Sequence, residues 1–333
     1  MKTLNSIFMD IAATALTAED QRLLAHPLVG GVVLFTRNFK SYAQLQVLVK
    51  DIRAVKPEII IAVDHEGGRV QRFKQGFTRI PPMATLGRLY HDNPHFAKEA
   101  AFAIAYLLAI ELGDVGIDLN VGPVLDLDYQ KNSAIGNRAL HANPRVVAAL
   151  GLAYMQGLKA AGMTAVAKHF PGHGYVAWDS HVSLPVDDRD AQTIYQQDLL
   201  PFQVLIQQGL AAIMPSHIIY KAVDPAITNF SEKWLKKILR KQLGFGGLVL
   251  SDDMHMQATH HSGNMVARAF KALQAGCDAV LICNDRHGLI STLTSLPQLS
   301  VLNTTPLRLK PHRHPNHEHV LATAKQWIRV LGV

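Results

Sequence analysis

The sequence contains only two cysteines among its 333 residues. Cys277 and Cys283 lie within one apolar stretch, CDAVLIC. An extended strand would hold their sulfur atoms too far apart to bond. We therefore expect two buried thiols rather than a disulfide.

Long apolar runs are also absent. The longest extends from Ala100 to Ile110, where Glu111 interrupts it, and this is too short to span a bilayer. The run instead predicts a buried helix. Residues 1–22 lack a charged segment followed by a long apolar core and a cleavage site of small residues, so they do not resemble a secretion signal. We expect no membrane partner and a cytoplasmic location.

Charged residues are few, at 18%, whereas apolar residues make up 48% of the chain. This composition is typical of a soluble globular enzyme with a large core. The net charge is +7, but the basic residues are scattered rather than gathered in a run with interleaved aromatics. We therefore expect no nucleic acid partner and a bias toward small anionic substrates. We also expect a monomeric protein.

Short β-branched runs that end in polar residues recur along the chain. Most are almost continuously apolar, as expected for a parallel sheet that is buried on both faces. The eight candidate strands are residues 6–11, 30–36, 58–66, 118–128, 163–170, 211–217, 247–253 and 278–284.

Segments with helical periodicity separate these strands. Thr17, Ser41 and Ser231 stand at helix starts, and Gly244 follows the last of these helices as a stop. Eight successive β-then-α units predict an α/β fold, a (β/α)₈ TIM-type barrel, as a single domain over residues 1–333. Within it, residues 306–333 should form an irregular segment rich in histidine and proline and then a last helix at about 320–331. The alternative, a doubly wound open sheet, is disfavoured by the strand count and by the lack of a GxGxxG turn.

A barrel of this kind carries its chemistry at the carboxyl ends of its strands. Polar residues do lie at this end of the predicted strands. They are Asp64, His65, Glu66, Asp126, Lys168, His169, Ser216, His217, Asp252, Asp253 and Asn284.

The stretch KHFPGHGYVAWDSH, residues 168–181, is rich in histidine. Its proline and glycines prevent a regular element from aligning the histidines, which disfavours a metal site. A metal-dependent hydrolase that uses this loop remains the alternative function. Asp179, two residues before His181, can accept a proton from the imidazole and leave its other nitrogen to act as acid or base. A histidine in a surface turn is the simpler interpretation of the same pattern.

Three further stretches carry charged groups. GLVLSDDMHM, residues 247–256, ends a strand with two carboxylates that repel each other. Alternation along the strand would turn one of them toward a reaction site, and Asp253 could instead cap a helix. VDHEGGRVQRF (63–73) and GNRAL (136–140) combine tight turns with acids and arginines, which can bind sugar hydroxyls or carboxylates. Turns with solvated charges are the alternative for both.

Taken in this order, VDHEGGRVQRF, GNRAL, KHFPGHGYVAWDSH and LSDDM resemble the bacterial β-N-acetylglucosaminidases of glycoside hydrolase family 3. The resemblance runs from about residue 7 to 286 and is strongest to the small cytoplasmic branch that recycles peptidoglycan. It implies a retaining exo-glycosidase, with no cofactor and no metal, that removes terminal β-1,4-linked N-acetylglucosamine from GlcNAc-anhydro-muropeptides.

Matching the motifs residue by residue assigns roles by resemblance. Asp252 would be the nucleophile and His181 the acid/base, with Asp179 as its partner. The chain departs from the family at His65, where glutamine is usual, and in the MHM that follows SDD, where leucine-serine-methionine is usual. The sugar-binding residues would be Asp64, Arg72, Arg138, Lys168 and His169.

Overall fold

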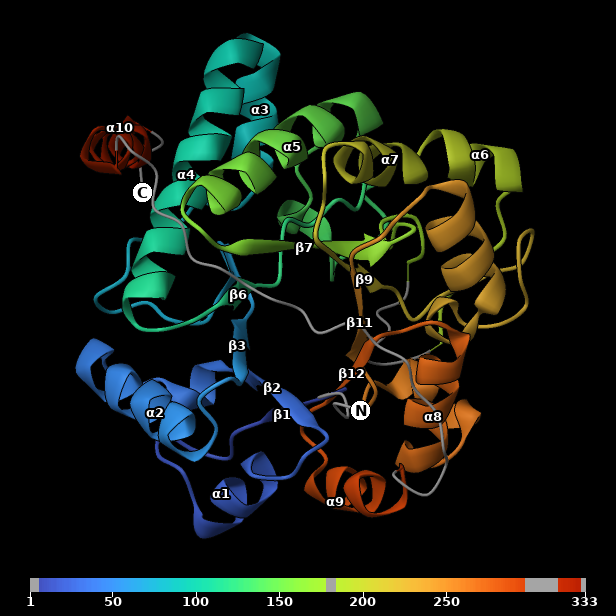
Figure 1. The fold of residues 1–333 in the computed structure, drawn as a ribbon. Coiled ribbons are helices and arrows are strands. Elements are labelled where there is room, and N and C mark those ends of the chain that lie inside the picture. Colours follow the sequence, from blue (N-terminus) through green and yellow to red (C-terminus); the bar gives the residue numbers. More distant parts are fainter. Residues whose placement is uncertain (1–5, 178–183, 297–316, 331–333) are drawn as a thin grey trace.

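A closed barrel of eight parallel strands forms the centre of the protein (Figure 1). The computed structural model describes residues 6–177, 184–296 and 317–330. Around the barrel the strands follow the order β1-β12-β11-β9-β7-β6-β3-β2, and β1 pairs with both β2 and β12 to close it. The predicted barrel is therefore confirmed. Its strands are β1 (Ile7–Asp10), β2 (Val29–Leu34), β3 (Ile60–Val63), β6 (Leu119–Asn120), β7 (Thr164–Phe170), β9 (Ala212–Pro215), β11 (Leu248–Asp253) and β12 (Ala279–Ile282).

All eight strands are somewhat shorter than the sequence predicts, and two of them, β3 and β6, end well before the predicted residue. The chain leaves β3 at Asp64 and turns into a small antiparallel pair, β4 (His65–Gly67) and β5 (Val70–Gln71). The strand β6 ends at Asn120 because Pro123, which has no N–H to donate to a ladder, follows closely. The early ending of β3 frees the next residues to turn at the carboxyl end of the barrel, whereas the residues just after β6 stay hydrogen-bonded to β7 through Gly122 and Leu125.

Helices surround the barrel and cover its outer face (Figure 1). Those that the structure describes are α1 (Ala18–Leu24), α2 (Tyr42–Val55), α3 (Ala84–Asp92), α4 (Pro94–Asp114), α5 (Pro144–Ala160), α6 (Ala191–Gln196), α7 (Leu199–Gln207), α8 (Met265–Ala275), α9 (Arg286–Ser295) and α10 (His317–Val330). Shorter 3-10 turns lie at η1 (Thr36–Asn38), η2 (Gly136–Arg138), η3 (Thr228–Phe230) and η5 (Gln257–Ser262), and η4 (Lys233–Gln242) is a π-helix.

The predicted helix starts are confirmed by their hydrogen bonds. Thr17 accepts from the Asp20 backbone N–H in a capping box, and Ser41 accepts from that of Gln44. The apolar run from Ala100 to Ile110 lies inside α4, which is buried on nearly all sides because α3, α5 and α10 pack against it.

Two apolar layers explain why the strands are continuously apolar. Phe8 points into the barrel, whereas its neighbours Ile7 and Met9 point outward to the helices. A Cβ atom on Gly31 of the adjacent strand would lie 2.2 Å from the ring of Phe8, so this glycine makes room for it. Cys283 belongs to the inner layer, and Cys277 belongs to the outer one. Both are buried free thiols, as predicted.

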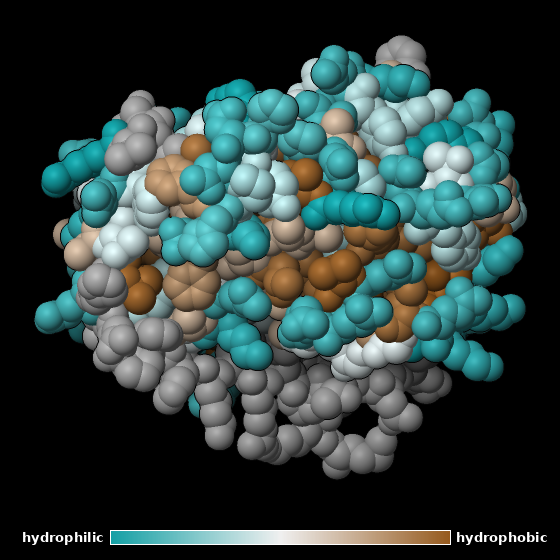
Figure 2. All heavy atoms as spheres, turned by 90° about the horizontal axis from the view of Figure 1, so that it is seen from above, coloured by the Kyte–Doolittle hydropathy of each residue, from teal (hydrophilic) through white to brown (hydrophobic). Residues whose placement is uncertain are grey.

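The face of the molecule that carries α3, α5, α6 and α7 is polar at its margins and has a band of apolar residues across its middle (Figure 2). The apolar side chains of α5 and α7 that reach the surface there are partly buried against the core. In the part of the chain that the structure describes, no helix is both long and apolar enough to cross a membrane.

Candidate active site

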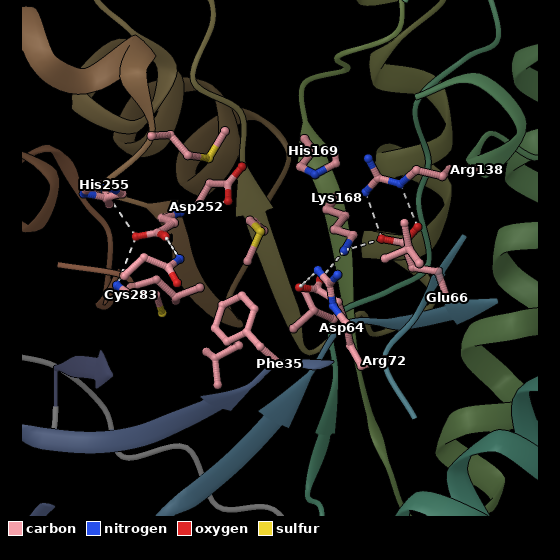
Figure 3. A pocket seen from close by; sticks show the side chains of 18 of the residues that line it. Phe35, Asp64, Glu66, Arg72, Arg138, Lys168, His169, Asp252, His255 and Cys283 are labelled. Carbon is pink, nitrogen blue, oxygen red and sulfur yellow. Dashed lines mark hydrogen bonds and ion pairs between the residues drawn. The ribbon is translucent and has the colours of Figure 1, made fainter. Parts of the chain in front are cut away.

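A cavity of about 460 Å³ opens at the carboxyl end of the barrel strands. Charged side chains from β7 and from the loops after β3 and β5 gather along one wall (Figure 3). The opposite wall is formed by the end of β11, by η5 and by the residues after β12. The pocket therefore lies where a (β/α)₈ barrel is expected to carry its chemistry.

The buried ammonium group of Lys168 is the centre of the charged wall. Its side chain is only 2% exposed, and Nζ lies 2.7 Å from Asp64 Oδ1 and 2.6 Å from Glu66 Oε1. Arg138 donates to both Glu66 oxygens through Nε and Nη2, at 2.8 Å each. Arg72 Nη2 lies 3.3 Å from Asp64 Oδ2. Three bases thus share two acids, so each buried charge has an opposite charge beside it.

These ion pairs hold the two carboxyl groups ionised. Burial alone would raise the pKa of Asp64, but Lys168 and then Arg72 outweigh it and hold that pKa well below its usual range. Burial likewise opposes ionisation of Glu66, yet Arg138 and Lys168 lower its pKa to about 2. The pKa of Lys168 is raised by the same two carboxylates, against the effect of its burial. The wall therefore presents fixed donors and acceptors at neutral pH.

The Gly-Gly turn brings Arg72 back to Asp64. Gly67 and Gly68 have positive φ angles of 105° and 54°, and a Cβ on Gly67 would lie 2.6 Å from the Pro81 carbonyl oxygen. The reversal between β4 and β5 depends on residues that tolerate this backbone.

His169 is held by a second buried carboxylate. Its Nδ1 lies 2.7 Å from Asp126 Oδ2, so it carries the hydrogen, and a ligand would meet Nε2. Asp126 Oδ1 also accepts from the backbone N–H groups of His169, at 3.1 Å, and His173, at 2.6 Å. Burial by itself would raise the pKa of Asp126, but His169 and His173 lower it to about 2.

Two adjacent carboxyl groups stand on the opposite wall. Asp252 Oδ1 accepts from the backbone N–H of Asp253 at 2.8 Å. Asp253 Oδ1 accepts from the backbone N–H groups of His255 and Cys283, at 3.0 and 3.1 Å. Burial, and to a smaller extent the Asp252 carboxylate, raise the pKa of Asp253 to about 7, although these hydrogen bonds oppose the shift.

Two expectations about this pair are wrong. Both Asp252 and Asp253 border the cavity, rather than one of them, because the pairing of β11 with β12 shifts register between Leu250 and Asp253 and alternation is lost. Asp253 also caps no helix, since its carboxylate bonds a turn and the end of the next strand.

Six of the predicted site residues meet at this one cavity. They are Asp64, Arg72, Arg138, Lys168, His169 and Asp252. The remaining two, Asp179 and His181, lie outside the residues that the structure describes. Within the described residues, no group of three or more histidine, cysteine, aspartate or glutamate side chains is placed to hold a metal ion.

The sequence interpretation gave no role to Glu66 and Asp126. Both stood among the polar residues at strand ends, which is the signal that could have selected them, but their partners could not be read from the sequence. Arg138 is 72 positions from Glu66 and only 13% exposed, so GNRAL is not a turn with solvated charges.

Comparison with known proteins agrees with this geometry. A family profile described as "Glycosyl hydrolase family 3 N terminal domain" matches residues 3–305. The chain belongs to glycoside hydrolase family 3. It is 48% identical over 327 residues to a β-hexosaminidase of Nitrosospira multiformis, with 94% of each chain covered. It is 47% identical over 331 residues to one of Thiobacillus denitrificans, covering 98% of this chain and 91% of that protein.

Solved structures of this family share the fold. Native NagZ from Neisseria gonorrhoeae is 41% identical, with a TM-score of 0.87 and 98% of each chain covered. The complex of NagZ from the same organism with N-trifluoroacetyl-D-glucosamine is 42% identical, with a TM-score of 0.83, covering 97% of this chain and 89% of that one. The family resemblance seen in the sequence is confirmed, and the chain is a glycoside hydrolase of the β-N-acetylhexosaminidase class.

The charged wall makes stability depend on pH in a defined direction. The native pKa of Glu66, about 2, lies below its ordinary value of 4.5, so its contribution is present above pH 4.5 and is lost as the pH falls toward 2. We expect Glu66→Gln to lower the free energy of unfolding at pH 7 by up to about 3 kcal/mol, because Lys168 and Arg138 lose a buried partner. The deficit should shrink as the pH falls from 5 to 2, as measured by urea unfolding.

Glu99→Gln, which removes an exposed carboxylate from α4, serves as the matched control. It should change the unfolding free energy little at any pH. A deficit for Glu66→Gln that stays constant between pH 5 and 2 would show that Glu66 is not held ionised by its partners.

Proposed function

We propose that this protein is a retaining exo-β-N-acetylglucosaminidase that removes terminal β-1,4-linked N-acetylglucosamine from peptidoglycan fragments, the GlcNAc-anhydro-muropeptides. In this proposal residues 1–333 act as one catalytic domain, in a cytoplasmic monomer that serves cell-wall recycling. One observation carries it. A cavity of sugar size has an ion-paired, hydrogen-bonding wall on one side and the Asp252 carboxylate on the other.

The charged wall suits the hydroxyl groups of a terminal sugar. Asp64 can accept from two hydroxyls, Lys168 and Arg138 can donate, and Nε2 of His169 can accept from a further hydroxyl. Arg72 holds the Asp64 carboxylate from its other side. Because these groups are already paired, their geometry is set before substrate arrives, which lowers the entropy lost on binding. The related NagZ that was solved with N-trifluoroacetyl-D-glucosamine supports an N-acylated glucosamine as the bound unit.

The proposed reaction is a double displacement. The Asp252 carboxylate attacks the anomeric carbon, the glycosidic bond breaks, and protonated His181 gives its proton to the leaving oxygen. Neutral His181 then takes a proton from water, whose oxygen attacks the same carbon and releases Asp252. Two inversions leave the sugar in the β configuration. Asp179 would accept from the His181 ring and make it more basic, a departure from the usual pair of carboxylates.

Asp252→Asn should abolish turnover of an aryl β-N-acetylglucosaminide without unfolding the protein. The amide keeps the size of the side chain and can still accept from the Asp253 N–H, but it is a far weaker nucleophile. We expect kcat to fall by at least about 1000-fold, with an unchanged thermal melting curve. Activity near that of the wild type would eliminate Asp252 as the nucleophile.

His181→Ala should slow poor leaving groups much more than activated ones. An alcohol leaving group needs the proton that His181 supplies, worth about 10² to 10⁴ in rate, whereas a nitrophenolate does not. The measurement is the rate of the glycosylation step across a series of aryl and alkyl glycosides. His261→Ala, which removes an exposed histidine of η5 that does not line the cavity, is the control. Equal losses for all leaving groups in His181→Ala would argue against an acid role.

A further inference from the structure

Asp253 borders the cavity beside Asp252, but its carboxylate is engaged with the protein. Oδ1 accepts from the backbone N–H groups of His255 and Cys283. The side-chain amide of Asn284 lies 3.4 Å from Oδ2 and points its nitrogen toward it. Three donors therefore converge on one carboxyl group, and two of them lie just beyond the end of β12. Asp253 thus ties the end of β11 to the end of the neighbouring strand.

Asn284 extends this connection to the first two strands of the barrel, at the place where β12 meets β1. Its side-chain oxygen accepts from Arg37 Nη1 at 3.0 Å, and its backbone N–H donates to Asp10 Oδ2 at 3.1 Å. Arg37 and Asp10 form an ion pair with each other. Asn284 has a φ of 60°, a left-handed conformation that asparagine tolerates better than most residues. The resulting circuit, Asp253–Asn284–Arg37–Asp10, links the ends of β11, β12, β2 and β1.

The same backbone segment orients Asp252. The Asp253 N–H is the donor to Asp252 Oδ1, so the direction of this peptide sets the direction of the Asp252 carboxylate. The carbonyl group of this same peptide and that of the next one are also held. Ser251 Oγ donates to the Asp252 carbonyl oxygen at 2.8 Å, and His217 Nε2 donates to that of Asp253 at 3.0 Å. The side chain of Asp253 accepts from the backbone N–H groups of His255 and Cys283, and these bonds also hold the residue that carries this N–H.

We propose that Asp253 is a positioning residue for the reaction: through Cys283 and Asn284 it fixes the Asp253 N–H and thereby aims the Asp252 carboxylate. This inference rests on the proposed role of Asp252 as nucleophile. A nucleophile must stand in line with the anomeric carbon, and a displacement of about 1 Å can cost about 100-fold in rate. Groups that lock the direction of such a side chain therefore contribute to the rate, although less than the reacting side chain itself.

Asp278 provides a matched control, because it also links these two strands but lies away from the cavity. Asp278 lies at the opposite end of the same two strands, where its Oδ2 accepts from the Val249 backbone N–H at 2.7 Å and pairs with Arg240. It also joins β11 to β12 and does not border the cavity. Loss of its charge should affect stability alone.

The test compares Asp253→Asn, Asn284→Asp, the double variant that carries both changes, and Asp278→Asn. In Asp253→Asn the new amide donor meets the Asn284 donor, and in Asn284→Asp two carboxylates face each other. The double variant restores one donor and one acceptor, and it gives Arg37 a carboxylate partner.

With an aryl β-N-acetylglucosaminide we expect kcat to fall about 10- to 100-fold in Asp253→Asn while KM changes little. The double variant should recover most of this loss.

Asp278→Asn should melt at a lower temperature but keep the wild-type kcat at temperatures where it is folded. If Asp253→Asn does not fold, the comparison of Asn284→Asp with the double variant decides, and recovery in the double variant supports the proposal. Three results would overturn it: a wild-type kcat in Asp253→Asn, no recovery in the double variant, or an equal fall of kcat in Asp278→Asn. An active Asp252→Asn would instead refute the proposed nucleophile, so the two failures are distinguishable.

Discussion

The burial of Lys168 between Asp64 and Glu66 is the interaction on which the site depends. An unpaired ammonium group at this depth would be strongly destabilising, and so would either carboxylate. The fold therefore has to bring both acids to the lysine, together with the arginines that balance them. Because each group is held by another, the geometry of this wall is set before any ligand arrives, and in the proposed function a sugar would exchange its water for contacts that are already in place.

The two walls of the cavity have different tasks in the proposed reaction. The charged wall carries paired groups that suit sugar hydroxyls, whereas the opposite wall carries the carboxylate proposed to react. The opposite wall is also held in place. The backbone N–H of Asp253 donates to the Asp252 carboxylate, and the Asp253 side chain accepts from the N–H of Cys283 at the end of the next strand. In the proposed reaction, positioning of this kind would let Asp252 act as nucleophile although a second carboxyl group lies beside it.

The sequence predicts the barrel well because its strands are buried on both faces. Runs such as GGVVLFT stay apolar, since one set of side chains fills the barrel and the other meets the helices. The same pattern places Asp64, Lys168 and Asp252 at the strand ends, where the structure brings them together.

Partners that are distant in sequence could not be predicted in this way. From the sequence, Arg138 is expected in a solvated turn, but in the structure its loop folds over Glu66 and the two side chains pair. Asp126 belongs to the site because it bonds the ring of His169, a contact that the sequence does not indicate. Alternation likewise predicts one carboxylate at the end of β11 facing the site, but a register shift against β12 brings both to its edge. Such features depend on how strands and loops meet, which local periodicity does not encode.

Proton NMR of the first-formed product tests the central claim most directly, because the path through Asp252 requires two inversions at the anomeric carbon. During hydrolysis of a β-N-acetylglucosaminide, the signal of the β anomer should appear first, and the α anomer should grow in later by mutarotation. Initial appearance of the α anomer would mean a single displacement by water and would contradict a glycosyl-enzyme on Asp252.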